Sequence, residues 1–396
     1  MTGLNPRILP QLILDWTQKD PHRDVLTFVE VDGHGGFRDE TRSYRQLWDN
    51  GQRIAQALID AGMGQGDRFA IMMQNHPEFV DAMVGSGIAN TMFVPIDPRT
   101  RGAKLQFMLD FAKCRGVVLT SSVLPQLVNV LPQLPRLSWV WVLVTEDSFG
   151  PPRELPAVRT LAEILAAPVP DLPILARDES APMQLLYTSG TTGDPKGIVT
   201  SYAKYGTVAS LNGVIGLRED DRPYSGLSLT HANAQVITLG NVLMMGLRGV
   251  FSRRFTKSRL WDICRHYGCT EFNLLGGMTT AIYSEPERPD DADNPVRYVI
   301  AAGMPASIWD RFRERFGVEI FEFYGTAEGG VSLNPPGTAP PGSIGIPPPT
   351  LIAKVLDDQG NECPPGVPGE LVFRNADGSC PPVDYYRNPE ASQEKV

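Results

Sequence analysis

The feature that most constrains this chain is a loop rich in glycine and hydroxyl side chains that directly follows an apolar stretch. Residues 185–188, Leu-Leu-Tyr-Thr, predict a strand, and the three glycines and one proline of residues 189–197 end it because these residues break a strand ladder. Small residues let the backbone approach a ligand closely, and successive N–H groups can bind an anion. The sequence therefore predicts a polyphosphate site formed by Thr188, Ser189, Gly190, Thr191, Thr192, Gly193 and Lys196.

Two other interpretations of this loop fit less well. A mobile surface loop is disfavoured by four hydroxyls, three glycines and a lysine within the ten residues 188–197. A P-loop has the pattern G-x-x-x-x-G-K-[ST], whereas Lys196 follows Pro195 and precedes Gly197. We therefore expect the loop to bind phosphate by a different arrangement.

Two further loops follow predicted strands at residues 298–300 and 318–323. Because ligands of a parallel α/β sheet bind at the carboxyl ends of its strands, we expect both loops to contribute to one site. A tyrosine on one loop and small residues on the other can hold a flat base between them, and a carboxylate oxygen suits Mg²⁺. The residues predicted to hold this flat base are Ala302, Gly303, Met304, Glu322, Phe323 and Tyr324, and the predicted Mg²⁺ ligand is Glu328.

Residues 187–197 resemble the signature loop of the adenylate-forming superfamily, which contains acyl-CoA synthetases, firefly luciferases and peptide-synthetase adenylation domains. Residues 324–328, Tyr-Gly-Thr-Ala-Glu, are similar to its Y-G-x-T-E motif. The resemblance implies that Tyr324 stacks on adenine, that Glu322 lies near the adenine amino group, and that the small-residue loop covers the other face. Ala327 departs from the motif, whose threonine contacts the α-phosphate. Loss of one such charge-assisted hydrogen bond costs about 1.5–3 kcal/mol.

Residues 227–235 resemble the motif that lines the acyl pocket in this superfamily, where a histidine or aromatic side chain approaches the substrate carboxylate. A lone histidine is more often structural, but its distance of about forty residues from the phosphate loop matches the superfamily. The H-x-N-A-Q form is most similar to the crotonobetaine/carnitine-CoA ligase branch. The implied pocket residues are His231, Asn233, Gln235, Gly276, Gly277, Gly325 and Thr326.

The resemblance implies an enzyme that uses ATP and Mg²⁺ to convert a small carboxylic acid into an acyl-adenylate with release of pyrophosphate. Its catalytic residues would be His231, Lys196 and Glu328. CoA would then accept the acyl group, as in an acid–thiol ligase. One alternative is another acceptor, such as carrier-protein pantetheine or an amine, and a second is a non-catalytic protein that binds nucleotide or acyl groups. Ala327 motivates both alternatives, whereas the complete phosphate loop opposes the second.

Predicted strands at residues 68–73, 92–95, 116–120 and 139–145 alternate with helical stretches, which indicates an α/β fold built from parallel βαβ units. We expect two parallel-rich βαβ-layered subdomains, residues 1–180 with a proline-rich connector and residues 181–334 with the ATP and acyl sites. A small, irregular, β-barrel-like subdomain is expected at residues 335–396. A capping box at Ser43 predicts the start of one helix, and further helices are predicted over residues 77–88, 201–215 and 306–316.

The resemblance covers the large N-terminal domain of the superfamily. We expect its small C-terminal lid domain, with the catalytic lysine that it carries, to be absent from this chain, so the chain alone should turn over poorly.

Composition excludes several classes of partner. The formal net charge of −9 argues against a nucleic-acid or anionic-membrane surface. The longest apolar run, residues 139–144, is far shorter than the roughly 20 residues of a membrane span. The five cysteines are odd in number and lack C-x-x-C spacing, which indicates free thiols in a reducing compartment. We therefore expect a cytoplasmic protein without a membrane span, and a homodimer stays an open alternative.

Overall fold

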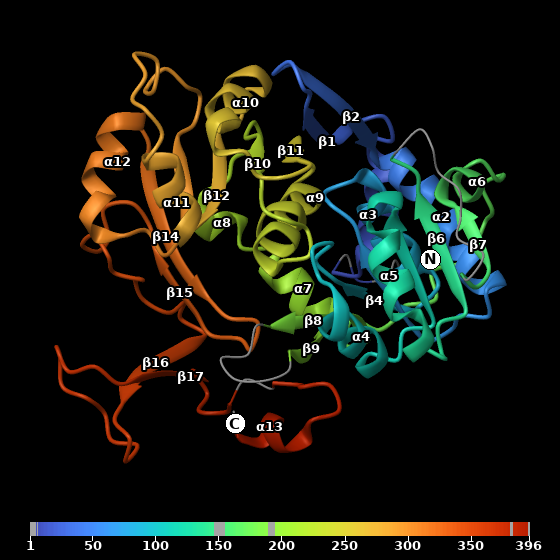
Figure 1. Cartoon of the computed structure of the whole chain (residues 1–396). Helices are drawn as coiled ribbons and strands as arrows, with labels where there is room; N and C mark the ends of the chain where they lie inside the picture. Colours follow the sequence, from blue (N-terminus) through green and yellow to red (C-terminus); the bar gives the residue numbers. More distant parts are fainter. Residues whose placement is uncertain (1–4, 6, 146–154, 189–194, 381–382, 395–396) are drawn as a thin grey trace. The chain divides into compact units, whose positions relative to one another are not determined.

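The computed structural model describes residues 5, 7–145, 155–188, 195–380 and 383–394 (Figure 1). The chain divides into two compact units, Met1–Phe255 and Thr256–Val396, and each is described by itself. The subdomain boundaries expected at residues 180 and 334 stay a prediction.

The first unit contains a seven-stranded sheet in the order β7-β6-β5-β3-β4-β8-β9. Its strands are β3 (Arg68–Met72), β4 (Met92–Pro95), β5 (Gly116–Thr120), β6 (Trp139–Leu143), β7 (Val158–Thr160), β8 (Pro182–Thr188) and β9 (Lys196–Ser201). All neighbours pair in parallel except β8 and β9, which pair antiparallel. Every residue of β4 and β5 is buried, as is typical of parallel strands covered on both faces. The prediction of an α/β fold with parallel sheets is confirmed.

A second set of paired strands in this unit runs in the order β2-β1-β11-β10, with β1 (Asp24–Val31), β2 (Phe37–Ser43), β10 (Pro223–Ser225) and β11 (Gly249–Ser252). The β1–β2 pair is an antiparallel hairpin, whereas β11 pairs in parallel with both of its neighbours. Asp32 Oδ1 closes the hairpin by accepting hydrogen bonds from the backbone N–H groups of His34 and Gly36, each at 2.8 Å.

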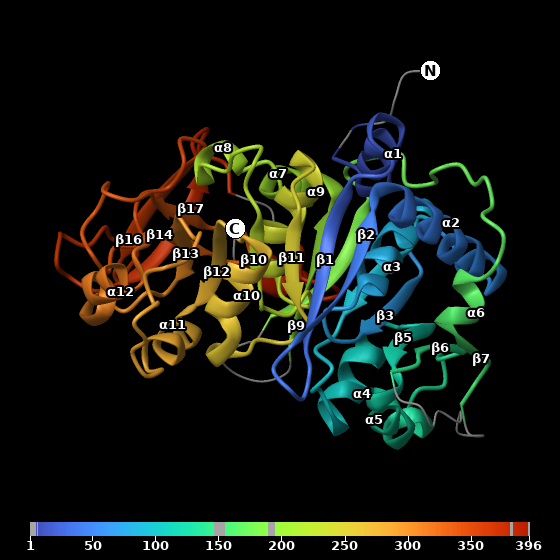
Figure 2. The same cartoon turned by 90° about the horizontal axis from the view of Figure 1, so that it is seen from above.

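The main helices of the first unit are α1 (Leu9–Lys19), α2 (Tyr44–Asp60), α3 (Pro77–Ile88), α4 (Gly102–Phe111), α5 (Leu124–Val130), α6 (Leu161–Leu165), α7 (Tyr202–Val208), α8 (Asn212–Ile215) and α9 (Asn241–Met245). The capping box predicted at Ser43 is present and opens α2. All twelve residues of α3 are buried, because this helix packs against α1, α2, β2 and β4 (Figure 2). Two glycines allow the close approach of α2 and α3. A Cβ at Gly51 would lie 2.5 Å from Val84 Cγ1, and one at Gly85 would lie 2.6 Å from Ile54 Cγ2.

The prediction of one continuous helix over residues 201–215 is wrong, because the chain turns between α7 and α8. Gly206, Thr207 and Val208 have weak helix propensity. The Ser210 hydroxyl also donates to the carbonyl of Gly206 at 2.7 Å, a bond of the kind that competes with regular helix geometry.

The second unit contains the strands β12 (Glu271–Leu275), β13 (Tyr298–Ala302), β14 (Glu319–Gly325) and β15 (Val331–Asn334). The first three pair in parallel, and β15 pairs antiparallel with β14. Its helices are α10 (Leu260–Tyr267), α11 (Gly276–Tyr283), α12 (Trp309–Phe316) and α13 (Pro389–Glu394). A short 3-10 turn, Ala306–Ile308, precedes α12, so the α-helix starts three residues later than predicted.

The proline-rich part of the second unit contains a small antiparallel sheet of two strands, β16 (Leu351–Leu356) and β17 (Glu370–Asn375). Neither strand contains a buried residue. Among the described residues, no helix is long and apolar enough to cross a lipid bilayer.

Candidate functional site

The predicted phosphate loop connects β8 to β9 in the first unit. Thr188 ends β8 as predicted, whereas Ser189, Gly190, Thr191, Thr192 and Gly193 lie outside the described residues. The prediction that the loop extends through Gly197 is wrong. Lys196 and Gly197 belong to β9, where Lys196 pairs with Thr188 and Gly197 pairs with Tyr187. The Lys196 backbone is therefore fixed in register with the last residue of β8.

A side-chain hydrogen bond holds the end of β8. The Tyr187 hydroxyl donates to the backbone carbonyl of Met108, in α4, at 2.7 Å. Tyr187 thus links the strand that enters the phosphate loop to the neighbouring helix, and sequence reasoning assigned it no such role.

His231 lies just before a π-helix, Asn233–Gly240. Its backbone N–H donates to the Ser228 carbonyl at 3.0 Å, and its own carbonyl accepts from the N–H of Gln235 at 3.0 Å. Desolvation lowers the pKa of His231, and the positive charge of Arg99 lowers it further, whereas the Asp97 carboxylate opposes both effects. The neutral imidazole is therefore favoured near neutral pH.

Asp97 and Arg99 were missed by sequence reasoning. They follow β4 at its carboxyl end, and this position was the one available signal. Arg99 binds Asp97 through two hydrogen bonds, from Nε to Oδ1 at 2.9 Å and from Nη2 to Oδ2 at 2.6 Å. These bonds hold the carboxylate in a fixed orientation.

The other two polar residues of the predicted acyl pocket lie on the π-helix. Gln235 is fully buried, and its Nε2 donates to the carbonyl of Leu229 at 3.2 Å. Gln235 Oε1 has no hydrogen-bond partner among the described residues. Asn233 is half-buried. π-Helical turns occur frequently at functional sites, which is consistent with a binding role for this segment.

In the second unit, a buried carboxylate fixes the loop predicted to cover adenine. Glu322, which is 3% exposed, accepts from the N–H of Gly303 at 2.7 Å through Oε1 and from the N–H of Met304 at 3.1 Å through Oε2. Burial raises the pKa of Glu322. The hydrogen bonds from these two backbone N–H groups lower the pKa, but burial is the larger effect. Gly303 has φ +93°, and a Cβ at Gly276, the first residue of α11, would lie 3.0 Å from the Gly303 carbonyl oxygen.

The remaining predicted residues occupy the end of β14 and the turn that follows it. Tyr324 is still part of β14, and its ring stacks on Phe373 with centroids 6.1 Å apart and an interplanar angle of 11°. In the turn, the N–H of Thr326 donates to the carbonyl of Gly330 at 3.0 Å, and the N–H of Gly329 donates to the carbonyl of Thr326 at 3.2 Å.

Glu328 accepts a hydrogen bond at its Oε1 from the hydroxyl of Tyr385, at 3.0 Å. Burial and the Glu328 carboxylate raise the pKa of Tyr385 to about 12, so this hydroxyl stays protonated and donates. Sequence reasoning assigned no role to Tyr385.

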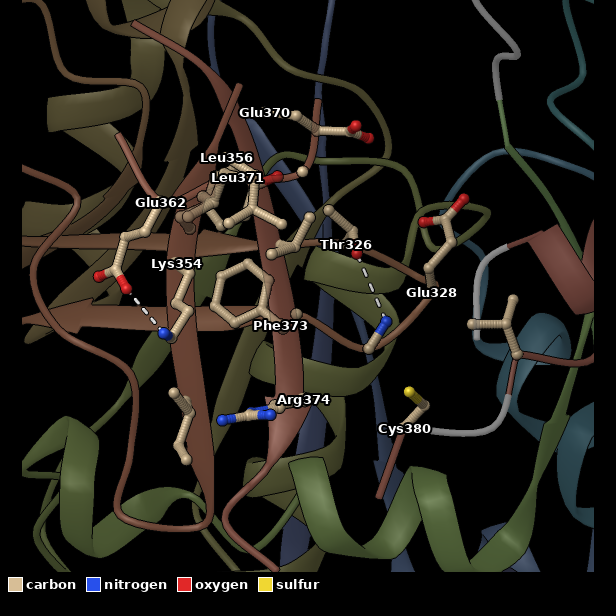
Figure 3. Close-up of a pocket in the computed structure, with 17 residues that line it drawn as sticks. Thr326, Glu328, Lys354, Leu356, Glu362, Glu370, Leu371, Phe373, Arg374 and Cys380 are labelled. Atoms are coloured by element: carbon tan, nitrogen blue, oxygen red, sulfur yellow. Dashed lines mark hydrogen bonds and ion pairs between the residues drawn. The ribbon is translucent and has the colours of Figure 1, made fainter. Parts of the chain in front are cut away.

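A cavity of about 750 Å³ brings several of these side chains together within the second unit (Figure 3). Tyr324, Thr326 and Glu328 line it together with Lys354 on β16 and Phe373 and Arg374 on β17. Cys380 also lines it. Lys354 pairs with Glu362 at 2.6 Å. Among the described residues, no cluster of three or more histidine, cysteine or acidic side chains could hold a metal ion by itself.

The remaining predicted contacts have different local settings. Phe323 is half-buried, and a Cβ at Gly325 would lie 2.8 Å from its ring. A Cβ at Gly277 would meet nothing within 4 Å. Ala302 is half-buried at the end of β13. The functional roles predicted for these residues stay predictions.

Comparison with known proteins identifies relatives in sequence. A family model described as AMP-binding enzyme matches residues 14–378. The chain is 31% identical over 375 residues to the medium/long-chain-fatty-acid–CoA ligase FadD17 of Mycobacterium tuberculosis, which covers 93% of this chain and 69% of that protein. It is 29% identical over 336 residues to long-chain fatty acid transport protein 2 of Rattus norvegicus, covering 83% of this chain and 52% of that protein. The chain thus spans about half the length of the rat protein.

Solved structures with low sequence identity share the fold. The anthranilate CoA ligase AuaEII in complex with anthranoyl-AMP superposes with a TM-score of 0.84 at 21% identity, covering 100% of this chain and 74% of that one. A benzoate CoA ligase from Burkholderia xenovorans superposes with a TM-score of 0.82 at 21% identity, covering 97% and 74%. The family model and the mycobacterial relative together show that this chain belongs to the AMP-binding enzyme family.

Proposed function

We propose that this chain is the ATP- and acid-binding part of an AMP-forming acid–CoA ligase. In the proposed reaction, the carboxylate of the acid attacks the α-phosphorus of ATP and pyrophosphate leaves, giving an acyl-adenylate. The thiol of CoA then attacks the acyl carbon and displaces AMP. Family membership and the 31% identity to a protein named as a CoA ligase support this reaction class.

The observation that carries the proposal is the arrangement at the carboxyl ends of β13 and β14. There Glu322 fixes the backbone of residues 303 and 304, and Tyr324 and Glu328 follow on the next strand and turn. Ligands of parallel sheets bind at this end of the strands. We assign adenine binding to Ala302, Gly303, Met304, Glu322, Phe323 and Tyr324.

The phosphates of ATP are assigned to the loop between β8 and β9, with Thr188 and Lys196 at its ends. Lys196 would neutralise charge that develops on the leaving pyrophosphate, which is the dominant requirement of such reactions. Mg²⁺ usually binds one or two carboxylates together with substrate phosphates. Glu328 fits this pattern. Its Oε1 accepts a hydrogen bond from the Tyr385 hydroxyl, and its Oε2 is the second carboxylate oxygen that can bind Mg²⁺. When bound, Mg²⁺ would supply additional neutralising charge.

Contacts with the acid are assigned in each unit separately: to His231, Asn233 and Gln235 in the first unit, and to Gly276, Gly277, Gly325 and Thr326 in the second. A neutral imidazole at His231 can donate one hydrogen bond to the substrate carboxylate. The buried Oε1 of Gln235 and the H-x-N-A-Q sequence support a small acid with a polar group, of the crotonobetaine/carnitine type. The relatives named above as fatty-acid proteins make medium- and long-chain acids the comparison to test.

A second candidate function is adenylation with an acceptor other than CoA, such as carrier-protein pantetheine or an amine. Ala327 favours this candidate. It replaces the threonine that contacts the α-phosphate in the motif, and a changed phosphate contact would fit a reaction with a different acceptor. We further propose a cytoplasmic location, which the free cysteines support, and leave a homodimer as an alternative to be measured.

The test is pyrophosphate release by the full-length protein with ATP, Mg²⁺ and a panel of small polar, aromatic and fatty acids, each with and without CoA. Release with one acid, and a thioester only when CoA is present, is the expected result. Release without a thioester would favour another acceptor. Absence of release with every acid, despite ATP binding, would overturn the ligase proposal.

A further inference from the structure

Tyr385 connects a late segment of the second unit to the carboxylate assigned to Mg²⁺. Its hydroxyl donates to Glu328 Oε1 at 3.0 Å across 57 positions of sequence. Tyr385 is 4% exposed, so burial restricts the movement of its ring. Glu328 is half-buried.

A local turn fixes the backbone of Tyr385. Its N–H donates to Ser392 Oγ at 3.0 Å, and the hydroxyl of Ser392 donates to the carbonyl of Asn388 at 2.9 Å. The N–H of Asn388 in turn donates to the carbonyl of Tyr385 at 3.0 Å. The start of α13 therefore holds the residue that binds Glu328.

Backbone hydrogen bonds of the neighbouring residues hold the turn that carries Glu328. Glu328 lies in the short turn after β14, where the N–H of Thr326 donates to the Gly330 carbonyl and the N–H of Gly329 donates to the Thr326 carbonyl. Glu328 lines the cavity with Thr326 and Phe373 (Figure 3). A carboxylate on such a turn can rotate about its side-chain torsions. A hydrogen bond from a rigid donor holds it in one orientation before the cation binds, which lowers the entropic cost of cation binding.

The geometry points to Tyr385 as a positioning residue that holds Glu328 through one carboxylate oxygen and presents the other to the divalent cation of the nucleotide. This inference rests on the proposed function, because it takes Glu328 as the cation ligand. Hydrogen-bond partners of metal-binding carboxylates typically change metal affinity about 10–100-fold when they are removed.

The test compares Tyr385→Phe with the unaltered full-length protein, using Mn²⁺ in place of Mg²⁺ and following free Mn²⁺ by electron paramagnetic resonance. In the presence of ATP, we expect Tyr385→Phe to weaken Mn²⁺ binding about tenfold, because the ring remains and only the hydroxyl is lost. Binding of ATP in the presence of EDTA should not change. Tyr386→Phe, which alters the adjacent tyrosine, is the matched control and should leave Mn²⁺ binding unchanged.

A double-mutant cycle separates positioning from a general structural effect. If Tyr385 acts through Glu328, then Glu328→Gln combined with Tyr385→Phe should bind Mn²⁺ no more weakly than Glu328→Gln alone. Ser392→Ala, which removes the acceptor for the Tyr385 N–H, should weaken Mn²⁺ binding in the same direction by a smaller factor. Additive effects of the two substitutions at Tyr385 and Glu328, or unchanged Mn²⁺ binding in Tyr385→Phe, would overturn the inference. Failure of the unaltered protein to bind ATP would instead overturn the proposed function.

Discussion

Ala327 stands directly before Glu328, in the turn where related motifs have a threonine. We predict that Ala327→Thr raises kcat/KM for pyrophosphate release about tenfold, because a hydroxyl here can donate to a phosphate oxygen. One hydrogen bond to a charged group contributes about 1.5–3 kcal/mol, and about 1.4 kcal/mol corresponds to a factor of ten in rate. Ala376→Thr, at an exposed position after β17, is the control for a general effect of the added side chain. An unchanged or reduced rate in Ala327→Thr would show that this position does not contact the phosphates.

Glu322 provides a second residue-scale prediction, because its two carboxylate oxygens accept from the backbone N–H groups of residues 303 and 304. Glu322→Gln replaces one acceptor oxygen by an NH₂ group, which can only donate. We expect weaker ATP binding by about tenfold and a loss of about 1–3 kcal/mol in the free energy of unfolding, since a backbone donor is left unsatisfied. Glu319→Gln, on the same strand but in an exposed ion pair with Arg313, is the control. Calorimetric ATP titration and urea unfolding measure the two effects.

The Glu322 contact also shows what a single sequence could not provide at this scale. The motif resemblance led us to expect Glu322 near the adenine amino group. Its hydrogen bonds to residues 303 and 304 depend on the register of β13 against β14, where Ala301 pairs with Glu322. Residue spacing along the chain contains no information on that register. Tyr385 and Phe373 were missed because their contacts with Glu328 and Tyr324 join segments that are distant in sequence.

At the scale of elements, α3 combines complete burial with an unusual set of charges. Arg42, on β2, forms ion pairs with Glu78 at 3.2 Å and with Asp81 at 3.3 Å, both on α3. Asn50 on α2 donates to Asp81 Oδ2 at 3.0 Å, while Asp81 Oδ1 has no hydrogen-bond partner among the described residues. Burial raises the pKa of Asp81 to about 7, against the opposing effect of Arg42. Burial lowers the pKa of His76, which precedes α3, to about 3, and the charge of Arg253 lowers it further.

These two shifts act on stability in opposite directions. Between pH 4 and 7, folded Asp81 retains a proton that the unfolded chain has lost, so its contribution to stability falls as pH rises. Between pH 3 and 6.5, the unfolded chain protonates His76 and the folded protein does not, so that contribution rises with pH. The two effects offset each other in the unaltered protein.

We therefore predict that Asp81→Asn makes the free energy of unfolding rise more steeply between pH 4 and 6.5, by on the order of 2 kcal/mol over that range. The substitution removes the Asp81 contribution, which falls as pH rises, and it leaves the His76 contribution, which rises with pH. Asp39→Asn, an exposed carboxylate on the neighbouring β2, controls for loss of one negative charge. Urea unfolding at several pH values measures the effect, and parallel curves for Asp81→Asn and the unaltered protein would contradict it.

Elements with strong internal patterns were predicted well, and those that depend on neighbours were not. The bounds of α3, β4 and β5 agree with the predicted ranges 77–88, 92–95 and 116–120. The two strands are short apolar runs, and α3 begins at Pro77, a residue that favours the first helical position. The strand β7 was missed within the proline-rich connector, since its three residues are not buried and form a strand only by pairing with β6. The start of β9 was missed for the same reason, because Lys196 and Gly197 favour a loop until β8 pairs with them.

At the scale of the whole molecule, the five cysteines lie in very different environments. Cys114 in the first unit and Cys264 and Cys269 in the second are buried, whereas Cys363 is half-buried and Cys380 is exposed. Burial raises the pKa of Cys114 to about 12, which disfavours the reactive thiolate. A thiol reagent applied to the folded protein should therefore modify the two late cysteines first.

Cys380 can also report nucleotide binding, because it lines the same cavity as Tyr324, Thr326 and Glu328 (Figure 3). We predict that ATP with Mg²⁺ slows alkylation of Cys380 by N-ethylmaleimide about tenfold or more, because bound nucleotide restricts access and a ligand that binds the native state suppresses local opening. Cys363 serves as the internal control, because it is not among the described residues that line this cavity, and its alkylation rate should not change. Mass spectrometry of timed samples gives both rates from one experiment. Equal protection of both cysteines would indicate general stabilisation of the fold, and no protection of Cys380 at saturating ATP would place the nucleotide outside this cavity.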